Sequence, residues 1–105
     1  PELSCLAVGA GSESGERIAA FPFDEDYEED LESGIADIKQ CTLEGGADHI
    51  HAARFLNRFI ENNVPWLHTD LSSSNRKGGL GAALSEVNGF GVGFGIQVLK
   101  KVLQK

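Results

Sequence analysis

The alternation of apolar and polar side chains predicts two well-defined helices. In residues 48–62, Ala, Leu, Phe and Ile recur at steps of three and four, which gathers them on one helical face. Two asparagines and Pro65 then end this pattern. A second apolar stripe runs through residues 92–103, and the lysines near its end are well placed against the negative end of a helix dipole.

Three further segments carry weaker helix and strand patterns. Residues 3–7 could form one short helical face, which the glycines at 9, 11 and 15 would end. Asp24 is placed to cap a helix that opens with seven acidic residues in residues 24–32, and Gly34 would stop it. Residues 66–71 alternate in the manner of a short strand, and residues 35–41 could form a short strand or a buried connector.

Helices alternating with short strands predict an α/β fold. Two short strands make a poor sheet by themselves, so we expect strands from elsewhere to complete the structure. The length of 105 residues allows one domain at most. Residues 72–90 form a long loop rich in serine and glycine, and loops of this length often carry function.

Composition and charge restrict the classes of partner. Apolar residues make up 41% of the chain, enough for a packed core, and the net charge is −7. This charge argues against nucleic acid and against an anionic membrane surface as partners. No apolar run reaches the roughly 20 residues of a membrane-spanning helix. We read Cys5 and Cys41, too few for a disulfide scaffold, as reduced thiols with packing roles in a cytoplasmic protein.

Two groups of polar residues invite a chemical interpretation. Asp48, His49 and His51 could bind a metal ion, but side chains two apart on a helix point about 200° apart. We therefore favour histidines on the helix surface, close to a partner. His68 and Asp70 could be a base and its orienting carboxylate, with a nearby serine as nucleophile, but a hydrogen-bond network at a strand end is favoured.

Five short motifs follow one another along the chain. Their order resembles the C-terminal end of the catalytic domain of the M17 leucyl aminopeptidases, over roughly residues 16–103. One departure is Asn88, where the family usually has threonine. The motifs are SGIAD at 33–37, GG at 45–46, AARFLNRF at 52–59, WLHTD at 66–70 and NGFGV at 88–92.

The resemblance implies a fold and a chemistry. The fold would be the C-terminal portion of a three-layer α/β/α domain, with residues 1–105 as a single partial domain. The family's cytosolic enzymes remove N-terminal residues from peptides with two divalent metal ions, Zn²⁺ or Mn²⁺, and are typically hexamers. The metal ligands belong to an upstream segment with the signature NTDAEGRL, which this chain lacks. The resemblance therefore implies no catalytic and no metal-binding residue here, and no metal for this chain alone.

By the same resemblance, Cys41, Ser72 and Asn75 match positions that help to line the substrate pocket; ordinary loop and packing roles remain the alternative. The leading hypothesis is a C-terminal fragment of a peptidase that supplies scaffold and part of the pocket and is inactive alone. The alternative is a stand-alone dimerisation or peptide-binding module. We expect the isolated chain to self-associate, as a dimer for example, because a partial domain exposes apolar surface.

Overall fold

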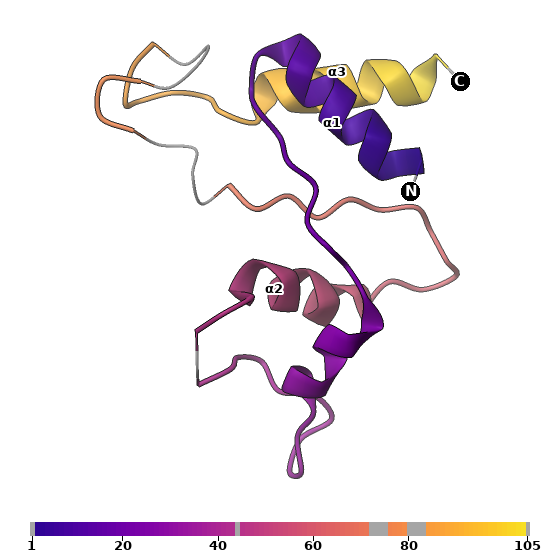
Figure 1. Ribbon diagram of the computed structural model, residues 1–105. Coiled ribbons are helices and arrows are strands. Elements are labelled where there is room, and N and C mark those ends of the chain that lie inside the picture. The colour runs from indigo at the N-terminus through magenta and orange to yellow at the C-terminus, as the bar shows by residue number, and fades with distance from the viewer. Residues whose placement is uncertain (1, 44, 72–75, 80–83, 105) are drawn as a thin grey trace. The chain divides into compact units, whose positions relative to one another are not determined.

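The computed structural model describes residues 2–43, 45–71, 76–79 and 84–104. Its elements are α1 (Glu2–Ser14), the 3₁₀ helix η1 (Glu25–Leu31), α2 (Asp48–Asn57) and α3 (Val92–Leu103), shown in Figure 1. They belong to two compact units. The first unit comprises residues 1–20 and 69–105, and the second comprises residues 21–68. No helix in the described residues is long and apolar enough to cross a membrane.

In the first unit, α1 and α3 pack side by side (Figure 1). Ala7 and Ala10 of α1 are buried against Phe94 of α3, and the partly buried Ile18 and Val98 extend this cluster. Small residues on α1 leave room for the phenyl ring of Phe94, so the two helices share a small dry core. The packing shows why α1 continues through two glycines that the sequence pattern predicted as its end.

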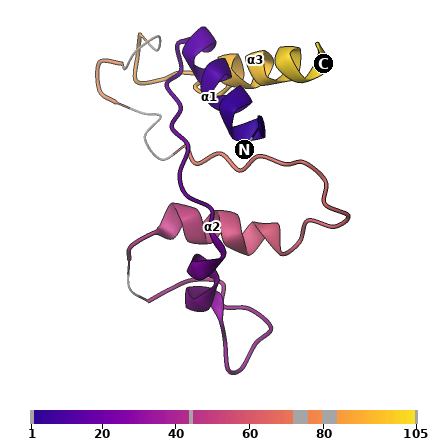
Figure 2. The same cartoon turned by 45° about the vertical axis from the view of Figure 1, so that its right-hand side comes forward.

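In the second unit, η1 packs against α2 (Figure 2). Leu31 at the end of η1 is only 1% exposed, and Ile50 and Ala53 of α2 are buried. Charged side chains join the two elements as well. The carboxylate of Glu28 accepts hydrogen bonds from Arg54 at 2.7 Å and from Arg58 at 2.6 Å. The Arg54 guanidinium also lies over the Phe23 ring, 4.5 Å from its centre.

This arrangement shifts the ionisation of Glu28. Burial by itself would raise the pKa of the Glu28 carboxyl, but hydrogen bonds from Arg58 and Arg54, and their positive charges, hold that pKa below its ordinary value of 4.5. One carboxylate of the acidic segment at residues 24–32 therefore holds η1 against α2, so this segment does more than contact solvent.

The predicted α/β class is wrong, because the described residues contain helices and no strand. Residues 35–41 fail as a strand for a local reason. The Ser33 hydroxyl accepts hydrogen bonds from the backbone N–H groups of Ile35 and Ala36, and the N–H of Lys39 bonds back to the carbonyl of Leu31. These bonds close a loop and compete with strand pairing. Residues 66–71 run without regular structure.

Several helix boundaries also differ from the pattern. The predicted helix at residues 48–62 begins at Asp48 but ends at Asn57, and Asn62 and Asn63 adopt left-handed φ values of 59° and 52°. Asp24 takes the N-cap position of η1, yet its side chain makes no capping hydrogen bond. The helix predicted over residues 92–103 is confirmed as α3.

Candidate functional site

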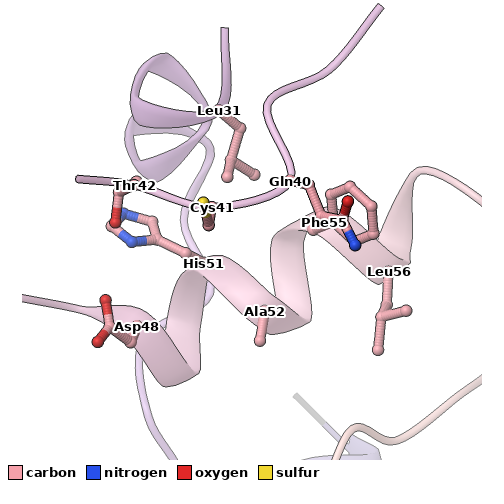
Figure 3. A pocket seen from close by; sticks show the side chains of 9 residues that line it. All are labelled: Leu31, Gln40, Cys41, Thr42, Asp48, His51, Ala52, Phe55 and Leu56. Atoms are coloured by element: carbon pink, nitrogen blue, oxygen red, sulfur yellow. The ribbon is translucent and has the colours of Figure 1, made fainter. Parts of the chain in front are cut away.

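A pocket of about 440 Å³ lies in the second unit, between α2, the end of η1 and residues 40–42 (Figure 3). Its apolar lining consists of Leu31, Ala52, Phe55 and Leu56. Its polar lining consists of Gln40, Cys41, Thr42, Asp48 and His51. This volume is within the range of small-molecule pockets, and the mixture of an apolar wall with a few polar groups is typical of them.

His51 is the most unusual group in this pocket. Its position on α2, one residue past the buried Ile50, turns it toward η1, where it is only 9% exposed. The ring Nε2 lies 2.8 Å from a carboxylate oxygen of Asp30. Because a carboxylate only accepts hydrogen bonds, Nε2 carries the proton in this pair. The prediction that both histidines lie on the helix surface is therefore wrong for His51, because packing against η1 covers it.

The second ring nitrogen of His51, Nδ1, is buried and has no hydrogen-bond partner. In the neutral ring this atom is an acceptor, since Nε2 holds the proton. A buried polar atom without a partner costs about 1–3 kcal/mol, so such atoms are rare and call for an explanation. Here the orphan atom belongs to a side chain that lines a pocket.

His49 has different neighbours from His51. Its ring packs edge-on against Phe21 with the ring centres 4.3 Å apart, whereas His51 faces Asp30 and Tyr27. The spacing of two residues on a helix predicts this divergence. Among the residues that the structure describes, no three His, Cys, Asp or Glu side chains come together as a metal site.

The structure places one of the three residues assigned to a substrate pocket. Cys41 is an exposed free thiol on the pocket wall, in the middle of the chain segment that crosses above α2 (Figure 3). Ser72 and Asn75 lie outside the described residues. The role of all three in binding substrate stays a prediction. Cys5 is likewise a free, exposed thiol.

The sequence pattern missed the pairing of His51 with Asp30. These residues are 21 positions apart, and no local spacing links them. The acidic run at residues 24–32 was the only available signal, because a helix rich in carboxylates offers partners to any basic group packed on it. The His68 ring lies near the Trp66 ring, at 6.2 Å between ring centres, and the hydrogen-bond network favoured for His68 and Asp70 stays a prediction.

Comparison with known proteins identifies the family. Residues 2–99 match the model of the cytosol aminopeptidase family, catalytic domain. A probable cytosol aminopeptidase of Wolbachia pipientis is 35% identical over 99% of this chain, and one of Rhodopseudomonas palustris is 33% identical over 97%. One of Ehrlichia ruminantium is 47% identical over 62% of the chain. The chain belongs to the cytosol aminopeptidase family.

The chain is short beside these relatives. It spans 20% of the length of the Wolbachia protein, 19% of the Rhodopseudomonas protein and 13% of the Ehrlichia protein. No solved structure matches it. The described residues do not fit the two divalent ions that the family resemblance implies, because no three His, Cys, Asp or Glu side chains come together among them.

Proposed function

We propose that this chain forms the C-terminal part of the catalytic domain of a cytoplasmic peptidase that removes N-terminal amino acids from peptides. It would supply scaffold and part of the substrate pocket, and residues outside it would supply the ligands for the divalent metals. The observation that carries this proposal is the family match over residues 2–99 in a chain that spans a fifth or less of its relatives.

Exposed apolar side chains support the proposal that this chain is part of a larger folded domain. Ile35 and Leu43 are fully exposed, and Leu84 and Val87 are each 90% exposed. Large apolar side chains in contact with water are costly, at about 25 cal/mol per Å² of apolar surface. Further protein surface that covers them would remove this cost.

A chimaera tests the proposal. We would replace the matching segment of the Wolbachia relative with this chain. We would then measure hydrolysis of leucine p-nitroanilide by the chimaera with Mn²⁺ or Zn²⁺. We expect activity from the chimaera and none from the isolated chain. The control is the relative with that segment deleted, which should be inactive. A folded but inactive chimaera would contradict the proposed role, and turnover by the isolated chain would show that the chain carries its own catalytic residues.

A second candidate function is a stand-alone dimerisation or peptide-binding module. The observation that favours it is the outer face of α3, where Val92, Leu99 and Leu103 are 64%, 62% and 83% exposed. Such a face can be covered by a second copy of the chain. Light scattering over a range of concentrations tests this candidate, because a dimerisation module predicts a defined dimer and a monomer at every concentration would contradict it.

A further inference from the structure

Asn88 and Gly89 form an exposed Asn-Gly pair just before α3. Neither residue belongs to a helix or a strand, and α3 begins at Val92. Asparagine is among the thermally labile residues, because the backbone nitrogen of the next residue can attack its side-chain amide. Glycine at that next position presents no side chain that would obstruct the attack, and its backbone is the most adaptable. The pair is therefore a candidate for a chemical modification.

An Asx turn holds the amide group of Asn88 beside the backbone nitrogen of Gly89. The side-chain Oδ1 accepts a hydrogen bond of 2.9 Å from the backbone N–H of Phe90, two residues further on. This bond closes a ring of atoms that contains both Cγ of Asn88 and the nitrogen of Gly89, so it restrains them near one another. The N–H of Phe90 also points at the oxygen that gains negative charge when Cγ is attacked.

The amide nitrogen of Asn88 is held less firmly than the amide oxygen. Nδ2 donates to the backbone carbonyl oxygens of Ser85 and Glu86, each at 3.3 Å, which is longer than is usual for such bonds. These three residues are exposed, so water reaches the amide group. The side chain thus combines an accessible carbonyl carbon, a polarised oxygen and a weakly bound amino group.

We propose that Asn88 is a site of spontaneous deamidation. The backbone nitrogen of Gly89 gives up its proton to hydroxide and forms a bond to Cγ of Asn88. The bond between Cγ and Nδ2 then breaks, and Nδ2 takes up a proton from water and leaves as ammonia. The product is a cyclic succinimide, which water opens at either of its carbonyl carbons. Attack of water at Cγ gives aspartate, and attack at the backbone carbonyl carbon gives isoaspartate.

The isoaspartate product changes the chain directly before α3. The backbone then runs through the former side chain of residue 88, which adds a carbon atom to it, and the former backbone carboxyl becomes the side group. This change removes the Asx turn with Phe90, and the two bonds from Nδ2 are lost with ammonia. We therefore expect α3 to begin less firmly in the modified chain.

Mass spectrometry of the whole chain, aged in mildly alkaline buffer and then digested with trypsin, tests the proposal. Cleavage after Lys77 and Lys100 gives the peptide 78–100, in which Asn88 is the single asparagine. The peptide 59–76 is an internal control, because it contains three asparagines and none of them precedes glycine. We expect peptide 78–100 to gain one dalton about tenfold faster than the control. Equal rates, or no gain of mass in either peptide, would overturn the proposal.

Gly89→Ala is the matched variant. Gly89 lies outside the left-handed region of φ, and a Cβ there would meet Cγ2 of Val92 at 3.6 Å, an ordinary contact. The variant should therefore fold like the parent chain, as circular dichroism can verify, while its methyl group obstructs the attack. We expect the gain of mass to be about tenfold slower than in the parent chain. An unchanged rate would contradict attack by the nitrogen of residue 89.

Asn88→Ser separates the chemistry from the turn. Its hydroxyl can still accept a hydrogen bond from the N–H of Phe90, but it has no amide to lose. Peptide 78–100 of this variant should gain no mass. Thermal unfolding then measures the effect of the modification: ageing should lower the melting temperature of the parent chain and leave that of Asn88→Ser unchanged. Equal melting temperatures of the fresh and the fully converted parent chain would contradict the expected weakening of α3.

Discussion

The carboxylate of Glu16 accepts a hydrogen bond of 2.6 Å from the backbone N–H of Phe94, 78 residues further along the chain. Phe94 lies in the first turn of α3, where backbone N–H groups have no partner within the helix. The N-cap residue of α3 is Gly91, at φ 99°, which has no side chain to supply a cap. Glu16, two residues past the end of α1, therefore supplies the cap that α3 lacks, and its negative charge also suits the positive end of the helix dipole.

Replacing Glu16 by alanine should destabilise the first unit by about 1 kcal/mol, the typical value of a lost helix cap. Urea unfolding followed by circular dichroism measures this change. The control is Glu13→Ala, which removes an exposed ion pair with Lys101 and should cost a few tenths of a kcal/mol at most. Equal losses in the two variants would show that Glu16 does not act as a cap.

The two glycines within α1 should respond to alanine with opposite signs. A Cβ at Gly11 would lie 2.6 Å from Cγ1 and 2.7 Å from Cβ of Ile18, which is a steric overlap. We expect Gly11→Ala to destabilise by about 1–3 kcal/mol in spite of its better helix propensity.

A Cβ at Gly9 meets only the end of the Lys101 side chain, at 3.9 Å. Gly9→Ala should therefore stabilise the chain by roughly 0.5–1 kcal/mol through helix propensity alone. Thermal unfolding of both variants and of the parent chain measures the two changes in stability. Stabilisation by Gly11→Ala would mean that Ile18 does not pack on α1 as described.

Glu28 should make the stability of the second unit sensitive to acid. Its pKa is lowered in the folded chain, so the folded carboxylate stays charged at a pH where the unfolded one takes up a proton. The stabilisation is present above the unfolded pKa, near 4.5, and is lost as the pH falls through the lower folded pKa. We would measure the free energy of unfolding of the parent chain and of Glu28→Gln with urea between neutral and acid pH. The two free energies should converge once the pH falls below the folded pKa of Glu28.

Glu25→Gln is the matched control for this pH dependence. Glu25 lies on the same 3₁₀ helix, and its substitution removes one acidic group without touching Arg54 or Arg58. We expect its unfolding free energy to follow the pH dependence of the parent chain. A constant difference between the parent and Glu28→Gln at every pH would contradict the lowered pKa of Glu28.

The outer face of α3 should govern self-association. Leu99 is 62% exposed, and we expect Leu99→Glu to shift the chain toward monomer in sedimentation velocity because a charge there resists burial. Lys100→Gln changes the net charge by the same amount and should not shift the distribution. A monodisperse monomer for the parent chain at high concentration would contradict any association through this face.

The sequence was informative where a structure depends on neighbours within a few residues. The start of α2 at Asp48 and the extent of α3 both follow from apolar residues at three- and four-residue steps. The family resemblance, drawn from five short motifs, is confirmed by the match over residues 2–99. Of the candidate site, only Cys41 could be placed on a pocket wall, and its role there stays a prediction.

What the sequence by itself determined is the family, the acidic character and the helices with a continuous apolar face, because these depend on composition and on short-range periodicity. Only the tertiary structure decided that residues 35–41 close a loop, that Glu16 caps α3, and that Asp30 engages one nitrogen of His51 while the other is left without a partner. Strand pairing, caps from distant residues and buried polar partners all join positions far apart in the chain, and no periodicity records which of them meet.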